Sequence, residues 1–437
     1  MKSIKSTTKI KCEFSLQSGT HLGGSKVLLD YLERIQLAQA FSKLSCFKAP
    51  HSLFPLHRIL LYLIVGWLVG CQRLFHFRTL QHDSLVRRFL GGRCPHHSLL
   101  YKELARVGAV KTVVLPQLKR WNIQMISPCL PNICILDLDS TVETVYGNQE
   151  GAAVGVNAHK RGRKSYHPLL AYEGKSRFAL NATLRAGNTH SATDAVTFVE
   201  QTLALLESRK VRYARFDKGF GGETFYSLFE MKHIGYVGKI KWTKRLQEQV
   251  RECRHWKRYV DEEWIIEGLT LFYKATSWDK HRRVCVIRKA PRFQGDQLLF
   301  DQPEMLELYW DYEAMVTTEV WESLDVWRFY NQRCCMENYI KEAKYGFVID
   351  RISTSDFAAN EIDLTLKLFA YNLFERFKKE CCEPVHQGYT IRRFRQEFIV
   401  CAGVLVEHSR RVILKLQRQF QGQQAWLKML QRVAALE

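Results

Sequence analysis

The chain is short of acidic residues, and this shortage bounds its partners. Aspartate and glutamate number 44 against 65 lysines and arginines among 437 residues, so the formal net charge is +21. The excess is spread along the chain rather than gathered in a tail, which fits a broad groove better than a targeting arm. A balance this basic favours nucleic acid as the partner, with an anionic membrane surface as the less favoured alternative.

Other absences argue against whole classes of protein. None of the 13 cysteines forms a CxxC unit, which argues against a zinc site and a secreted disulfide framework and predicts reduced thiols. The longest apolar run, Ile59 to Cys71, is too short to span a bilayer. The N-terminus lacks an apolar signal core. We therefore expect a cytoplasmic protein with no membrane partner.

Changes in sequence texture divide the chain into five predicted segments. The first is helical with interleaved arginines and lysines, which suggests a DNA-binding module; a solvated basic surface is the alternative. The second alternates strand and helix patterns, as in an α/β layer. The third is β-rich, the fourth returns to helix, and the fifth is ambiguous. The segments span residues 1–125, 126–240, 241–315, 316–380 and 381–437, in that order.

Two aspartates stand at the ends of predicted strands. Asp139 closes the apolar run 133–138, and Asp217 closes the run 211–216. Sites in open α/β sheets gather at the carboxyl ends of strands. Together with a helical glutamate, Glu337, these residues can form a cluster of oxygen ligands for hard divalent cations. In a chain this basic, the natural substrate of such cations is a phosphodiester.

Each aspartate also has a competing interpretation. Asp137 lies two residues before Asp139 in one strand, so their side chains share a face and either could be the ligand. We favour Asp139, because it stands at the strand end beside Ser140. A strand-end aspartate can also simply bond the following turn. Glycines follow Asp217 without a Gly-Lys-Ser/Thr motif, so a glycine turn accounts for them better than a phosphate loop.

The glutamate lies in a predicted helix that returns near Glu319 and continues through Lys344. At about 100° per residue, five side chains share a stripe about 80° wide beside an apolar stripe. They are Tyr330, Arg333, Glu337, Lys341 and Lys344. The helix would then pack by one side and present an acid and cations along the neighbouring side. Ordinary i,i+4 surface pairs are the alternative.

These residues resemble the DDE transposases of bacterial insertion sequences. The resemblance rests on Asp139-Ser140-Thr141, on Asp217-Lys218-Gly219-Phe220 and on the Tyr330/Arg333/Glu337/Lys344 array, and it covers roughly residues 132–378. The most similar branch has an RNase H-like core, a β-strand insertion before the last acid and a Tyr-Arg-Glu-Lys signature. The resemblance implies an α/β fold, in which an RNase H-like mixed sheet core carries a β-rich insertion and follows an N-terminal helical DNA-binding region.

The resemblance also implies a role for each matched residue. Asp139, Asp217 and Glu337 would be catalytic and would hold two Mg²⁺ or Mn²⁺ ions. Four neighbours would contact DNA near the cleaved end: Tyr330, Arg333, Lys341 and Lys344. The expected enzyme is a metal-dependent polynucleotidyl transferase and endonuclease. It would cleave DNA at the ends of an insertion sequence and join the freed 3′-hydroxyl to target DNA, which is cut-and-paste transposition.

The partners that the resemblance implies are double-stranded DNA and a second copy of the chain. The DNA includes the terminal inverted repeats of the element and the target, and residues 381–437 are the candidate region for dimerisation. The expected location is the bacterial cytoplasm, at the nucleoid.

Two alternatives remain open, and one departure from the family pattern motivates the second. The first is a nuclease on the same core that hydrolyses without strand transfer, and the second is an inactive DNA-binding relic. This chain has Lys218 where relatives often carry a serine, which places a cation beside an expected metal ligand.

Overall fold

The computed structural model describes residues 10–44, 48, 52–158, 160–291, 309–409 and 411–436. The chain divides into two compact units. The first contains residues 1–43, 48–100 and 380–437, and the second contains residues 44–47 and 101–379. The first and last predicted segments thus share one unit, whereas residues 101–125 belong to the other. Parts of the predicted segments 1–125, 126–240, 241–315 and 381–437 lie outside the described residues.

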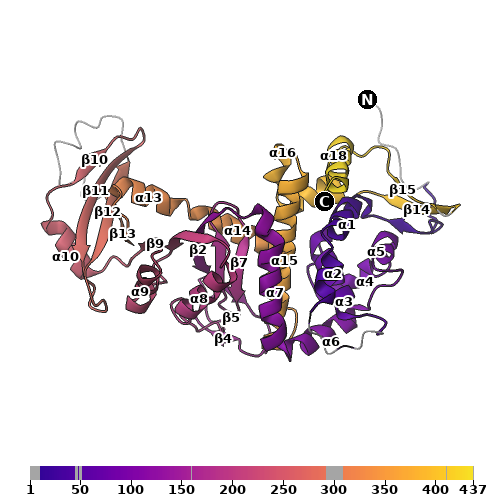
Figure 1. Ribbon diagram of the computed structural model, residues 1–437, viewed down its shortest axis with the longest axis horizontal. Helices are drawn as coiled ribbons and strands as arrows, with labels where there is room; N and C mark the ends of the chain where they lie inside the picture. The colour runs from indigo at the N-terminus through magenta and orange to yellow at the C-terminus, as the bar shows by residue number, and fades with distance from the viewer. Residues whose placement is uncertain are drawn as a thin grey trace. The chain divides into compact units, whose positions relative to one another are not determined.

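The first unit combines helices with a small antiparallel sheet in the order β1-β14-β15 (Figure 1). Its main elements are α1 (Lys26–Arg34), α2 (Leu37–Ser42), α3 (Leu56–Val69), α4 (Phe77–Leu80), α5 (Ser84–Phe89), α16 (Pro384–Gln387), α17 (Ile391–Phe394), α18 (Gln423–Ala434), β1 (Gly19–Thr20), β14 (Gly403–His408) and β15 (Arg411–Leu416).

Helix α3 forms the centre of this unit because it is apolar on nearly every side. The Phe77 ring packs edge-on against Tyr62 and Trp67. It lies so close to Gly66 that an added Cβ would sit 2.1 Å from it, so this position needs glycine. By length and composition no single described helix could cross a membrane, although α3 and Leu74–Leu80, bent by 92°, pass that test as a pair.

Side chains from the C-terminal part of the chain form hydrogen bonds with its N-terminal part. The Trp426 indole donates to the Gly24 carbonyl at 2.8 Å, and the Tyr31 hydroxyl donates to Glu380 at 2.6 Å. Arg395 donates to two carbonyls of α3, those of Trp67 and Leu68. The last carbonyls of a helix have no partner within it, so Arg395 satisfies groups that burial would otherwise leave costly. These bonds explain why residues far apart in sequence form one unit.

The second unit is built on a nine-stranded mixed sheet in the order β10-β11-β12-β13-β9-β8-β2-β6-β7. These strands are β2 (Ile133–Ser140), β6 (Leu169–Glu173), β7 (Ala179–Thr183), β8 (Lys210–Phe216), β9 (Gly235–Lys239), β10 (Lys257–Tyr259), β11 (Trp264–Tyr273), β12 (Arg282–Pro291) and β13 (Asp311–Thr317). The main helices are α6 (His97–Gly108), which begins in the first unit, α7 (Lys111–Ile126), α8 (Ala195–Leu205), α9 (Glu223–Met231), α10 (Lys244–Glu252), α13 (Ser323–Asn331), α14 (Cys334–Phe347) and α15 (Phe357–Cys381).

Five of these strands have the RNase H-like arrangement. β2, β6 and β7 pair in sequence as an antiparallel meander, while β8 and β9 add in parallel on the other side of β2. The helices α8 and α9 follow β7 and β8 and carry the chain back for the next parallel strand, as parallel pairing requires. The predicted fold class, an α/β RNase H-like mixed sheet, is confirmed.

The β-rich insertion extends the core sheet instead of forming a separate one. β13 pairs antiparallel with β9, and β12, β11 and β10 follow outward. The insertion is not wholly β, because α10 lies within it. Arg282 of β12 ties it to α9 through ion pairs with Glu223 and Glu230, 2.6 and 2.8 Å long. Nη1 and Nη2 of Arg282 bond both carboxylate oxygens of Glu223, at 2.7 and 2.6 Å. Bidentate pairs of this kind are among the stronger hydrogen bonds, and this one holds the insertion on the core.

The two faces of β2 and β8 differ in chemistry because side chains alternate along a strand. Leu138 and Phe216 belong to an apolar core shared with α8 and α9. On the opposite face Asp137 forms a bidentate ion pair with Arg215, at 2.6 and 2.7 Å, and both side chains are 1% exposed. Gly174 makes room for the pair, since an added Cβ would lie 2.5 Å from the guanidinium.

We predict that Asp137→Asn lowers the free energy of unfolding by about 3–5 kcal/mol, because it leaves a buried guanidinium without its counter-charge. Urea unfolding measures the change. Lys257→Gln is the matched control: it removes an ion pair with Glu322 whose partners are more than half exposed, and such pairs add little stability. Equal midpoints for Asp137→Asn and wild type would contradict a structural role for the Asp137–Arg215 pair.

Candidate active site

The pairing of β2 with β8 brings two of the predicted acids to one place. Leu138 lies opposite Phe216 in the parallel register, so the next residues along, Asp139 and Asp217, are level at the strand ends. By alternation they share the face that carries Asp137. The Asp139 side chain is 22% exposed. Asp137 is buried in its pair with Arg215, which leaves Asp139 as the accessible carboxylate of the two.

The predicted single helix from Glu319 to Lys344 is wrong. Helix α13 ends at Asn331 and α14 begins at Cys334, with a tight turn between them. The amide of Arg333 donates to Tyr330 and that of Met336 donates to Arg333, which are i→i+3 bonds. Such bonds advance about 120° per residue rather than 100°, so the turn rotates α14 relative to α13. Tyr330, Arg333 and Lys344 nevertheless bond to Asp217, Asp139 and the Val142 carbonyl.

The Arg333 side chain lies against the carboxyl end of β2. Its Nη2 lies 3.0 Å from Asp139 Oδ2, and Nε and Nη2 both donate to the Leu138 carbonyl, at 3.4 and 3.2 Å. The side chain is 6% exposed. Burial alone would lower the pKa of the guanidinium, but Asp139, Tyr330 and Asp217 raise it above its ordinary value. Arg333 is thus a fixed positive charge between the acids.

Tyr330 approaches the second aspartate. Its hydroxyl donates to Asp217 Oδ1 at 3.4 Å, a long bond that contributes little. Burial raises the pKa of this phenol, and the charges of Asp217 and Asp139 raise it further, while Arg333 lowers it. The hydroxyl therefore stays protonated at neutral pH and acts as a donor.

The three predicted acids share one electrostatic environment. Burial raises the pKa of Asp139, Arg333 and the Ser140 amide lower it, and the charges of Asp217 and Glu337 raise it again. Nevertheless, no group of three or more histidine, cysteine, aspartate or glutamate side chains in the described residues is placed to hold a metal ion. Arg333 pairs with Asp139 and Tyr330 donates to Asp217 in this structure. The predicted cluster of oxygen ligands is therefore not formed in it.

The remaining predicted residues lie along α14. Glu337 and Lys341 are exposed. Lys344 is half-buried and donates to the Val142 carbonyl at 3.2 Å. The structure therefore gathers Asp139, Asp217, Tyr330 and Arg333, couples Glu337 to them through charge, and leaves Lys341 on the surface. The catalytic and DNA-binding roles of all seven stay predictions.

Lys218 lines a cavity beside the site. The cavity has a volume of about 230 Å³, and Lys239 and Lys241 also line it. Three lysines around one opening make a positively charged flank next to Asp217. The departure from the family pattern therefore adds to the charge that attracts phosphate.

One acid near the site was missed by the sequence analysis. Glu143, on β3 (Glu143–Thr144), is 1% exposed, and its Oε1 has no hydrogen-bond partner among the described residues. Burial raises its pKa from 4.5 to about 8, although Lys344 and Lys367 lower it. Its position four residues after Asp139 carries no motif, so the sequence offered no signal.

We predict that Glu143 makes the protein less stable as the pH rises from about 4.5 to about 8. In this window the unfolded chain has already released the proton that the folded chain still binds, so the free energy of unfolding falls. Glu143→Gln removes this dependence. The stability of the variant relative to wild type should therefore increase between pH 5 and pH 8 in urea unfolding, and a difference independent of pH would contradict the buried titration.

The chain is similar to known proteins in two comparisons. A family model described as "Transposase DDE domain group 1" matches residues 2–437. Among solved structures, the chain is similar to one in "Cryo-EM structure of piggyBac transposase synaptic complex with hairpin DNA", with 12% identity, a TM-score of 0.41 and coverage of 85% of this chain and 80% of that one. No curated protein matches. Because the family model spans nearly the whole chain, the protein belongs to the DDE transposases, in domain group 1.

Proposed function

We propose that this transposase cleaves DNA at the ends of an insertion sequence and joins the freed ends to target DNA by a cut-and-paste reaction. One observation carries the proposal: the parallel register of β2 and β8 sets Asp139 and Asp217 level at adjacent strand ends. The charge of Glu337, on α14, also acts on Asp139, in a chain with a net charge of +21. The bacterial cytoplasm, where chromosomal DNA lies, is the proposed location.

The residues present fit a pair of divalent cations in their chemistry. Carboxylate oxygens are the ligands that Mg²⁺ and similar hard cations take. Burial raises the pKa of Asp139, and the charges of Asp217 and Glu337 raise it further; a bound cation would offset both effects. When bound by Asp139, Asp217 and Glu337, such ions supply charge that activates an attacking oxygen and stabilises a leaving one.

The cationic side chains of the site would bind and orient the DNA strand. Nε and Nη2 of Arg333 are bonded to Leu138 and Asp139, and Nη1 is directed by the same rigid plane, so it can donate to a phosphate oxygen. Tyr330 supplies a protonated hydroxyl beside Asp217. Lys344 anchors the next turn of α14, and the exposed Lys341 extends the charge outward.

Binding of a second copy of the chain is part of the proposal. Joining two ends of an element to one target requires two active sites, and a homodimer provides them by symmetry. Residues 381–437 remain the candidate region for that contact.

We predict that Glu337→Gln abolishes cleavage of a labelled duplex carrying the element's end in Mg²⁺ but leaves binding of that duplex intact. The change removes one negative charge and keeps the shape of an exposed side chain. Glu342→Gln, on the same helix, is the matched control and should cleave like wild type.

Two results would contradict the proposal. Cleavage by Glu337→Gln at the wild-type rate would refute the assignment of the third acid. Ends that wild type cleaves but never joins to a plasmid would refute strand transfer and favour a simple nuclease.

We predict that DNA affinity falls steeply with salt, by about one logarithmic unit of slope for each phosphate neutralised. Fluorescence anisotropy measured between roughly 50 and 300 mM KCl gives this slope. An affinity that does not change with salt would count against DNA as the substrate.

A further inference from the structure

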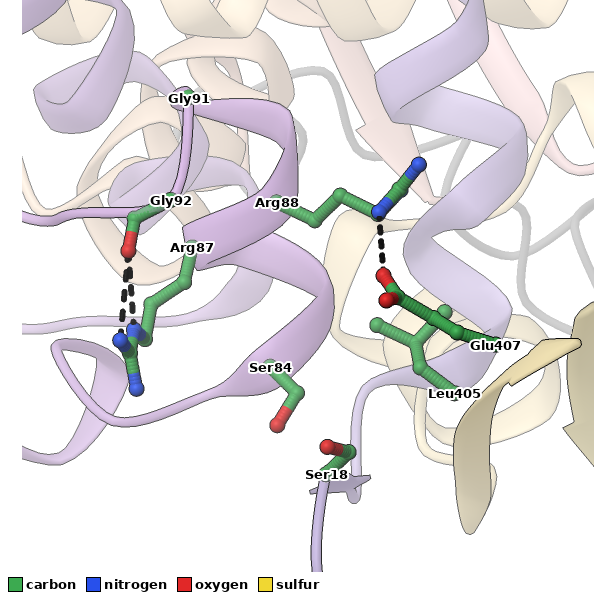
Figure 2. Close-up of a pocket in the computed structure, with 8 residues that line it drawn as sticks. All are labelled: Ser18, Ser84, Arg87, Arg88, Gly91, Gly92, Leu405 and Glu407. Carbon is green, nitrogen blue, oxygen red and sulfur yellow. Dashed lines mark hydrogen bonds and ion pairs between the residues drawn. The ribbon is translucent and has the colours of Figure 1, made fainter. Parts of the chain in front are cut away.

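A second basic cavity lies in the first unit, apart from the acids. It has a volume of about 560 Å³ and is lined by residues of α5 and β14 (Figure 2). Arg87, Arg88 and the hydroxyls of Ser18 and Ser84 supply its donors, and Glu407 is the one carboxylate among its described lining residues. Such a lining suits an anion with several oxygen acceptors, and it offers little to an apolar ligand.

The end of α5 fixes one wall of this cavity. Gly91 and Gly92 adopt φ of +77° and +89°, and their amides bond back to Arg88 and Arg87, which closes the helix in a left-handed turn. The Gly92 carbonyl then accepts from both Nε and Nη2 of Arg87 at 3.3 Å. Figure 2 shows this guanidinium on the side of Gly92, Arg88 extending in the opposite direction toward Glu407, and Ser84 and Ser18 below them.

The other end of the helix is anchored too. Asp83 caps α5 by accepting from the Leu85 and Val86 amides, and it also accepts from the Thr20 hydroxyl of β1 at 2.5 Å. The Ser18 carbonyl accepts from the Leu405 amide of β14 at 3.1 Å. These bonds hold the helix and the hairpin in one frame, so the cavity is built into the fold of this unit.

Arg88 is the movable charge of the cavity. Its Nη1 lies 3.0 Å from Glu407 Oε1, with 52% of the arginine and 75% of the glutamate side chain exposed. An ion pair so exposed adds little stability, so a stronger anion can replace the carboxylate. Arg58 adds positive charge near this wall. Its guanidinium lies beside Gly91, with Nη2 3.1 Å from where a Cβ at that residue would be.

We propose that this cavity binds a backbone phosphate of DNA outside the active site, and that Glu407 competes with the phosphate for Arg88. The inference rests on the proposed function, which supplies DNA as the ligand. Arg87 and the two serines form the fixed part of the site, and Arg88 changes partner when the phosphate enters. Glu407 therefore weakens DNA binding and reduces the attraction of other small anions.

The full-length chain with a fluorescent DNA duplex tests the proposal by anisotropy. Arg88→Gln should weaken binding several-fold more than its control and reduce the salt slope by about one. Glu407→Gln should tighten binding. The matched controls are Arg393→Gln and Glu397→Gln, which alter a second exposed arginine–glutamate pair of the same unit with the same changes in net charge. Thermal melting confirms that each variant is folded.

The outcomes separate the cavity from the wider function. If wild type binds DNA but the Arg88 and Glu407 variants change no more than their controls, the phosphate site is refuted and the proposed function stands. If wild type does not bind DNA, the proposed function fails. Calorimetry with inorganic phosphate alone is the third arm: phosphate binding that Arg88→Gln abolishes, with DNA affinity equal to the control, would assign the cavity to free phosphate and overturn the DNA assignment.

Discussion

Parallel pairing of β2 with β8 is the constraint on which the site depends. It brings Asp139 and Asp217 level at adjacent strand ends, on the face opposite the apolar core. A slip of either strand by one residue would exchange its faces and bury its acid among apolar side chains. The buried Asp137–Arg215 pair resists that slip, because each charge finds its partner only in this register. The same two strands therefore carry both the stabilising Asp137–Arg215 pair and, two residues further along each strand, the acids Asp139 and Asp217.

The break between α13 and α14 adds the second part of the site. Arg333 lies in the i→i+3 turn between them and bonds to the Leu138 carbonyl and to Asp139. Positive charge is thereby held among carboxylates that repel one another. On the proposed function, cations or phosphates that offer more charge would replace these contacts, as electrostatic stabilisation at a phosphoryl-transfer site requires.

Much of this was predictable from sequence, and the remainder depended on distant contacts. Apolar runs ending in aspartate predicted β2 and β8, and the mixed strand and helix pattern predicted the core. The helix break could not be predicted, since Gln332 and Arg333 keep helical dihedral angles and neither glycine nor proline marks the turn. Nor could the role of Asp137, because its partner lies 78 residues away. The joining of the two chain ends likewise rests on side-chain bonds that leave no local pattern.

The central proposal is that Asp139, Asp217 and Glu337 bind the same pair of cations once Arg333 has left Asp139. Crystals grown with Mn²⁺ and the terminal DNA test it most directly, through the anomalous scattering of the metal. The account predicts manganese within about 2.5 Å of Asp139 and Asp217 carboxylate oxygens, with Arg333 moved from Asp139 to a phosphate. Manganese bound elsewhere, with the Asp139–Arg333 ion pair unchanged, would contradict it.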